Sequence, residues 1–94
     1  MTLEKLYSII KDRAQNGFSD SYVASLVKRG EDRVIQKVGE EAIEVVIAMK
    51  GTDKKEMIAE TSDLIFHLLI LLCFQKISVE EIYEELEKRS QKSE

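Results

Sequence analysis

The chain has 94 residues, which suffices for one domain but gives a limited hydrophobic core to a protein that folds alone. A net charge of −4 argues against broad nucleic-acid binding, which needs a basic surface, and 44% hydrophobic residues argue against a disordered chain. The length predicts a single domain over residues 1–94. The one cysteine cannot form an intrachain disulfide and suits a reducing compartment, so we expect a cytoplasmic protein.

Apolar residues recur with helical periodicity in five segments, and no segment shows the strict alternation of a half-buried strand. Capping residues and glycines mark the ends of these segments. The expected helices cover about residues 3–15, 20–29, 31–50, 53–75 and 78–87. The predicted end signals are Thr2, Gly17 with a Phe18–Ser19 linker, Asp20 or Ser21, Gly30, Gly51, Asp53 and Ser78. The sequence therefore predicts an all-α, bundle-like fold.

The longest apolar run lies in the second half of the fourth expected helix, between Leu64 and Phe74. It has about half the length that spans a bilayer, and the charged, amphipathic amino terminus does not resemble a signal peptide. We therefore predict a buried core helix, in which Cys73 packs as a small hydrophobe, and no membrane partner. A small domain surrounds such a helix most easily by pairing with a second copy, so we expect a four-helix core completed by dimerisation.

Two acidic pairs stand on the third and fourth expected helices. Glu41 and Glu44 form the first pair, and Glu60 and Asp63 form the second. The spacing i, i+3 places both carboxylates of a pair on one helical face, one turn apart. The turn signal at Gly51–Asp53 lets the two helices fold back antiparallel, so we expect the four carboxylates to face each other.

The surroundings of these acids differ from those of ordinary solvated helix acids. Such acids usually have Lys or Arg four residues later, whereas the residues at those positions here are Val45, Ala48, Leu64 and His67. Carboxylates beside apolar residues are expected to be partly buried, and several that converge repel each other unless a cation lies among them. Carboxylate oxygens favour Mg²⁺ or Mn²⁺ over zinc. The alternative is that all four are ordinary exposed helix acids.

Two further residues of the third helix lie beside its acidic pair. Glu40 and Glu44 are like charges at i, i+4, which is unfavourable unless a cation bridges them, so Glu40 is a candidate extra ligand. Lys37 stands four residues before Glu41 and either pairs with that acid or reaches a substrate phosphate. The residues alone leave these two roles of Lys37 open.

Other candidate residues rest on weaker signals. His67 stands four residues after Asp63, either as a satisfied core group beside the acids or as an acid, base or phosphate contact. Ser21 and Tyr22 fit a helix cap and a core aromatic residue. Gly39 lies inside the third helix, where glycine costs about 1 kcal/mol relative to alanine, which indicates close approach of a ligand or another helix.

The stretch from Ser21 to Leu72 resembles the phosphoribosyl-ATP pyrophosphohydrolases of the second step of histidine biosynthesis. The matching motifs are S-Y at residues 21–22, K-V-G-E-E-A-x-E at 37–44, E-x-x-D-L-x-x-H-L-L at 60–69 and L-x-x-I-I-K-D-R at 6–13. The two acidic motifs are also similar to those of the wider MazG-like superfamily of all-α nucleoside triphosphate pyrophosphohydrolases. The S-Y element and the K-x-G-E-E-A form favour the histidine-pathway family.

The resemblance implies a homodimer of helical bundles that hydrolyses phosphoribosyl-ATP to phosphoribosyl-AMP and pyrophosphate with Mg²⁺. The positions that match the family's metal-binding acids are Glu41, Glu44, Glu60 and Asp63. The positions that match its neighbouring catalytic and substrate-binding groups are Glu40, Lys37, Ser21, Tyr22 and His67. Many members are fused to the cyclohydrolase of the next step, whose zinc-type cysteine pattern is absent here, so we expect a stand-alone enzyme.

Alternatives to this function remain open. The same acids would serve a MazG-like housecleaning enzyme that acts on canonical or modified nucleotides. A non-enzymatic dimerisation module would tolerate Glu→Gln changes in both pairs and would show no effect of divalent metal on its stability. A di-iron carboxylate bundle needs Glu-x-x-His pairs, which this sequence lacks.

Overall fold

The computed structural model describes residues 1–16 and 21–91, and these residues form five helices and no strand. The helices are α1 (Leu3–Gln15), α2 (Tyr22–Arg29), α3 (Glu31–Lys50), α4 (Lys54–Gln75) and α5 (Val79–Gln91). The all-α prediction is confirmed. The expected end of the fifth helix at about residue 87 is wrong, because α5 continues to Gln91. The predicted signals at residues 17–20 lie outside the described residues.

Side chains cap four of the helices where the sequence predicts them. The hydroxyl groups of Thr2 and Ser21 each accept a hydrogen bond of 3.1 Å from the backbone N–H three residues later. The Asp53 carboxylate accepts from backbone N–H groups of the first turn of α4. Before α5, the Ser78 N–H donates to the Glu81 carboxylate at 2.7 Å, and the Glu81 N–H donates to the Ser78 hydroxyl at 3.2 Å. These bonds satisfy N–H groups that a helix terminus leaves without partners.

Gly30 and Gly39 have different structural surroundings. Gly30 joins α2 directly to α3 with a φ of 98°, a left-handed conformation that glycine adopts without the steric cost of a side chain. Gly39 lies inside α3, and a Cβ atom placed there would meet no atom within 4 Å. No helix of the described chain approaches Gly39, so that part of the sequence interpretation is wrong within one chain.

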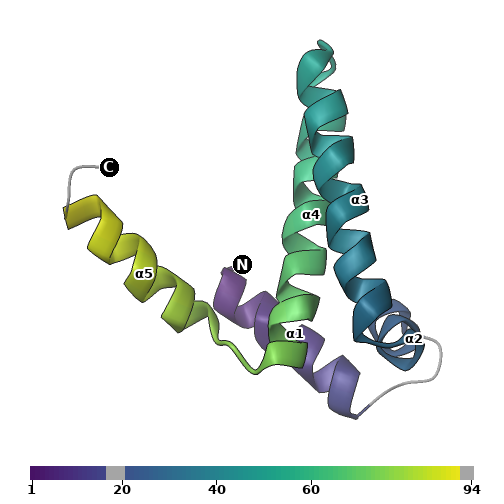
Figure 1. Cartoon of the computed structure of the whole chain (residues 1–94), viewed down its shortest axis with the longest axis vertical. Helices are drawn as coiled ribbons and strands as arrows, with labels where there is room; N and C mark the ends of the chain where they lie inside the picture. Colours follow the sequence, from purple (N-terminus) through teal and green to yellow (C-terminus); the bar gives the residue numbers. More distant parts are fainter. Residues whose placement is uncertain (17–20, 92–94) are drawn as a thin grey trace.

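Helices α3 and α4 form a long antiparallel hairpin (Figure 1). Helix α1 packs against α4, α2 and α5, and α2 also packs against α3, so these helices form a base at the end of the hairpin where α4 finishes. Helix α5 extends away from that base, toward the side opposite α2 (Figure 1). Among the described helices, none therefore lies beside the upper half of the hairpin.

The buried core lies in the base. Ile10 of α1, Val34 of α3 and Ile70 of α4 are buried almost completely. The other buried residues of this cluster are Val23, Leu26, Leu69 and Val79. The acidic pairs on α3 and α4 begin seven residues away from Val34 and Ile70, which is about two helical turns along the hairpin. The core thus fixes the separation and rotation of the two helices just below the acids.

Many apolar side chains on the remaining surface of the hairpin are exposed to solvent. Leu68 in the second half of α4 is 39% exposed, and Ile43 and Ile47 of α3 are 61% and 57% exposed. Burial of α4 on most sides, which its apolar sequence predicts, is therefore wrong within one chain. By its length, and by an 18-residue window with a mean hydropathy of 1.8, α4 could also cross a membrane. However, Glu60 and Asp63 lie within it, and charges are costly in the bilayer interior.

Candidate metal centre

Three of the predicted acids meet on the facing sides of α3 and α4. One carboxylate oxygen from each of Glu41, Glu60 and Asp63 lies within 4.8 Å of the others. Glu41 is only 9% exposed, whereas Asp63 is exposed and opens the cluster to solvent. The prediction that the two acidic pairs face each other across an antiparallel hairpin is confirmed for these three residues.

Glu44 does not join this cluster. Its side chain is exposed, although it stands one turn after Glu41 on the same helix. Partial burial and the charges of Glu41, Glu44 and Asp63 raise the pKa of Glu60 above its ordinary value. Glu44 therefore adds negative potential to the site without joining it. The prediction that all four carboxylates converge is wrong for Glu44 in this structure.

Lys37 pairs with an acid in this structure, which is the first of the two roles that the sequence left open. Its ammonium nitrogen lies 3.2 Å from a carboxylate oxygen of Glu41, one helical turn further along α3. This hydrogen bond, together with the charge of Glu41, raises the pKa of Lys37 and keeps it protonated. The buried member of the acidic cluster is thus already neutralised by a cation from its own helix.

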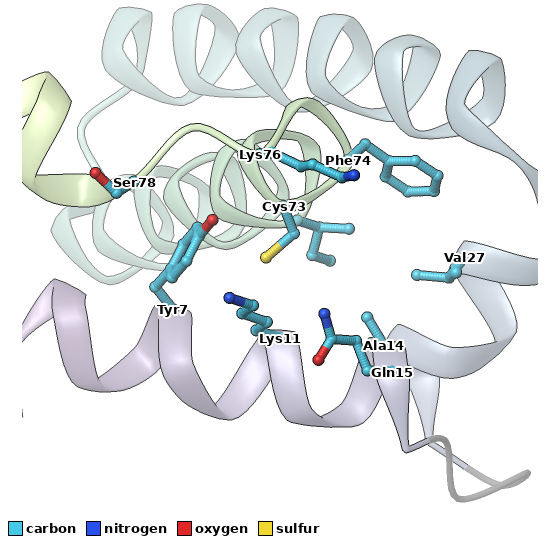
Figure 2. Close-up of a pocket in the computed structure, with 10 residues that line it drawn as sticks. Tyr7, Lys11, Ala14, Gln15, Val27, Cys73, Phe74, Lys76 and Ser78 are labelled. Carbon is cyan, nitrogen blue, oxygen red and sulfur yellow. The ribbon is translucent and has the colours of Figure 1, made fainter.

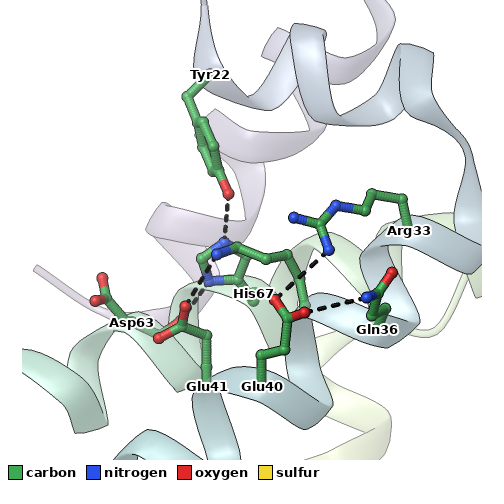
Figure 3. Close-up of polar contacts among 8 residues, drawn as sticks. Tyr22, Arg33, Gln36, Glu40, Glu41, Asp63 and His67 are labelled. Carbon is green, nitrogen blue, oxygen red and sulfur yellow. Dashed lines mark hydrogen bonds and ion pairs between the residues drawn. The ribbon is translucent and has the colours of Figure 1, made fainter.

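Glu40 points to a different set of partners on α3. Its carboxylate forms an ion pair of 3.5 Å with Arg33 and accepts a hydrogen bond of 3.1 Å from Gln36 (Figure 3). The side-chain Nε of Arg33 is buried and has no hydrogen-bond partner among the described residues. Sequence reasoning missed Arg33, although its position four residues before Lys37 places both cations on one face of α3.

A chain of hydrogen bonds links α2 to the acidic part of α4. The Tyr22 hydroxyl lies 2.7 Å from Nε2 of His67, and Nδ1 of His67 lies 2.7 Å from the backbone oxygen of Asp63 (Figure 3). His67 is 5% exposed, and both of its ring nitrogens have partners. Ser21 serves as the cap of α2, while Tyr22 remains 47% exposed.

The three converging carboxylates fit one divalent cation. Bonds of about 2.1 Å place oxygens on opposite sides of a Mg²⁺ ion about 4.2 Å apart, and the spread of the cluster is close to that value. An all-oxygen donor set with an open side suits a hard ion that keeps several water or phosphate ligands. Within the described residues, Glu41, Glu60 and Asp63 are therefore the residues that would hold the metal.

The chain also has a cavity of about 480 Å³, which lies elsewhere between α1, α2 and the end of α4 (Figure 2). Cys73 borders it, ten residues after Asp63 and hence about 15 Å further along α4. Partial burial raises the pKa of the Cys73 thiol, so this cysteine is a poor nucleophile. Because none of the described residues that line the cavity is a carboxylate, these residues do not share the metal chemistry of the acidic cluster.

Comparison with known proteins shows the family of this chain. Residues 3–90 match the family described as phosphoribosyl-ATP pyrophosphohydrolase. The chain is 42% identical to the phosphoribosyl-ATP pyrophosphatase of Clostridium novyi, over 96% of this chain and 82% of that protein. It is 48% identical to the enzyme of the same name from Geobacter metallireducens, over 93% of this chain and 80% of that protein.

A bifunctional relative is similar to this chain over part of its own length. The histidine biosynthesis bifunctional protein of Caldanaerobacter subterraneus is 49% identical over 96% of this chain, which covers 44% of that protein. The matching region includes the three converging acids, Lys37 and the Tyr22–His67 pair, because the family match spans nearly all described residues. The chain belongs to the phosphoribosyl-ATP pyrophosphohydrolase family.

Proposed function

We propose that this protein hydrolyses phosphoribosyl-ATP to phosphoribosyl-AMP and pyrophosphate, the second step of histidine biosynthesis. The observation that supports this most is the cluster of Glu41, Glu60 and Asp63 in a chain of this family. A divalent ion held there, Mg²⁺ or Mn²⁺, would neutralise the phosphoryl oxygens on both sides of the bond to be broken. Water supplies the new oxygen, and pyrophosphate is the leaving group, so no covalent nucleophile from the protein is needed.

The residues around the acids are proposed to bind the substrate and to orient the attacking water. Lys37 and Arg33 bring two cations to the face of α3 that carries the acids, where they can meet phosphate oxygens. Glu44 lies next to the cluster and, with the three converging acids, is a candidate to orient the attacking water. Tyr22 and Ser21, at the start of α2, are proposed to contact the nucleotide part of the substrate, because the Tyr22 hydroxyl lies beside His67, which contacts Asp63.

The active protein is proposed to be a cytoplasmic homodimer. An apolar groove along α1, α4 and α5 is lined by Leu3, Ile65, Leu68, Leu69, Leu72, Val79, Ile82, Tyr83 and Leu86. A second copy that covers this groove and the exposed apolar residues of α3 would bury α4 on most sides, as its sequence predicts. A hairpin that pairs with another hairpin gives the four-helix core that one chain lacks.

The test of this function is a substrate panel. Pyrophosphate release is measured from phosphoribosyl-ATP, ATP, GTP and dUTP, each with Mg²⁺ and with a chelator in its place. We expect release from phosphoribosyl-ATP only, and only with the metal. Turnover of the ordinary triphosphates instead would assign the chain to the housecleaning branch. A folded protein that turns over nothing would favour the dimerisation module.

A further inference from the structure

We infer that His67 is a positioning residue, which acts by holding Tyr22 of α2 against the metal-binding part of α4. This inference rests on the proposed function and adds a role that the acids do not supply. His67 is buried, and its ring nitrogens bridge two helices: Nε2 contacts the Tyr22 hydroxyl and Nδ1 contacts the backbone oxygen of Asp63, each at 2.7 Å. Asp63 is itself one of the three converging acids.

The contact with the backbone oxygen of Asp63 fixes the position of one proton on the His67 ring. A backbone carbonyl oxygen can only accept, so Nδ1 must carry a proton and donate it to Asp63. If the ring is neutral, Nε2 has a lone pair, and the Tyr22 hydroxyl donates to it. For a neutral ring, the geometry therefore selects the Nδ1–H tautomer, in which Nδ1 donates to Asp63 and Nε2 accepts from Tyr22. In this state the ring has no free nitrogen with which to reach a substrate phosphate.

Aromatic packing restrains the same pair. The ring of His67 stands edge-on to the rings of both Tyr22 and Phe66, with centroid distances of 5.7 Å and 5.6 Å. Tyr22 also lies beside Phe66, at a centroid distance of 6.2 Å and an angle of 28°. Edge-to-face pairs at these distances are favourable, so the rings hold the imidazole in the plane that its hydrogen bonds need. Tyr22 nevertheless keeps nearly half of its surface exposed.

This link joins the helices that carry the metal-binding acids to the helix that carries the residues proposed to contact the nucleotide. The acids belong to α3 and α4, which pack along each other and do not need α2 to converge. Tyr22 and Ser21 belong to the first turn of α2, an eight-residue helix. Loss of the Tyr22–His67 hydrogen bond should therefore release the start of α2 while the acids stay in place. The expected defect is in substrate affinity, at unchanged metal affinity.

The tautomer can be observed without any activity, because the chain has a single histidine. In a long-range proton–nitrogen NMR spectrum of the labelled metal-free protein, His67 should show a protonated Nδ1. Tyr22→Phe should shift Nε2 and leave the Nδ1 proton in place. A ring protonated at Nε2 alone, or an Nε2 signal that Tyr22→Phe leaves unchanged, would overturn the inference even if the enzyme is active.

The functional role is tested with Tyr22→Phe, which removes one hydroxyl. We expect KM for phosphoribosyl-ATP to rise about tenfold, because a buried nitrogen loses its partner. We expect kcat and the affinity for Mn²⁺, measured by electron paramagnetic resonance, to change less than about twofold. Tyr7→Phe is the matched control, since the Tyr7 hydroxyl donates to the backbone oxygen of Ile77, fourteen residues after Asp63 and beyond the end of α4. Equal KM values in both variants would contradict the inference.

Substitutions of His67 complete the test. Gln offers a side-chain oxygen that can accept from Tyr22, whereas Leu offers none. We expect His67→Gln to retain a KM closer to the unmodified protein than His67→Leu does, with both variants folded by circular dichroism. If His67→Gln is as impaired as His67→Leu, the hydrogen bond to Tyr22 is not what His67 contributes. An unmodified protein that fails to turn over phosphoribosyl-ATP would refute the proposed function, and the NMR result would still decide the tautomer.

Discussion

The ammonium group of Lys37 lies 3.2 Å from the carboxylate of Glu41, the most buried of the three converging acids. A divalent cation at the cluster needs the same carboxylate as a ligand. Lys37 and the metal therefore compete for Glu41, unless Lys37 turns toward another anion. The phosphate groups of the substrate are such an anion. We therefore expect metal binding and substrate binding to be coupled through this lysine side chain.

Replacing Lys37 by Met should raise metal affinity and lower substrate affinity. The ion pair is partly exposed, and such pairs contribute up to about 1 kcal/mol, so Mn²⁺ binding without substrate should tighten by up to about fivefold. KM for phosphoribosyl-ATP should rise in the same variant, because a phosphate-binding cation is lost. Calorimetric titration of the metal and steady-state kinetics measure both effects. Weaker metal binding in Lys37→Met would show that the lysine does not compete.

The acids should differ in their contribution to metal binding. Glu41→Gln removes a converging oxygen and should weaken Mn²⁺ binding by at least about tenfold. Glu40→Gln should weaken it much less, because Arg33 and Gln36 hold that carboxylate outside the cluster. The Glu44→Gln variant should lie between them, since Glu44 contributes charge without converging. Equal losses for Glu40→Gln and Glu41→Gln would contradict the three-acid assignment.

The raised pKa of Glu60 gives a stability effect with a definite sign. Between the ordinary value of 4.5 and the higher folded-state pKa, the folded protein binds more protons at Glu60 than the unfolded chain does. The contribution of this group to stability therefore falls as the pH rises through that interval. The metal-free Glu60→Gln variant should melt at a higher temperature than the unmodified protein at pH 7. The two melting temperatures should draw together as the pH approaches 4.5. A Gln variant that melts lower at pH 7 would contradict this prediction.

The apolar groove along α4 should control assembly. Leu68→Glu places a charge among the groove residues and should convert a dimer into monomers, as measured by sedimentation equilibrium. Ser8→Glu adds the same charge to an exposed position of α1 outside the groove and serves as the control. Dissociation by Ser8→Glu as well, or a dimer that survives Leu68→Glu, would place the interface on another surface.

Local features of the fold could be predicted from the sequence because they depend on neighbouring residues. Thr2 and the Ser78–Glu81 pair form their capping bonds within one turn, so the boundaries of α1 and the start of α5 follow from the residues themselves. The i, i+3 spacing likewise placed Glu60 and Asp63 on one face.

Features that depend on tertiary packing could not be predicted. Whether Glu41 or Glu44 turns toward α4 depends on the rotation of α3, which the buried core at Val34 and Ile70 fixes. Tyr22 and His67 are separated by 45 residues in the chain, and no local sequence pattern predicts their hydrogen bond. The exposure of α4 has a similar cause, since its apolar surface exceeds what one chain of this size can cover.

The most direct test of the central claim compares pyrophosphate release from phosphoribosyl-ATP by the unmodified protein and by Asp63→Asn. Both are assayed at saturating substrate across a Mg²⁺ titration, with circular dichroism to show that helicity is retained. We predict Mg²⁺-dependent turnover by the unmodified protein and a loss of at least about a thousandfold in Asp63→Asn, because a metal ligand is removed. Full activity in a folded Asp63→Asn variant, or turnover that persists in a chelator, would contradict the account.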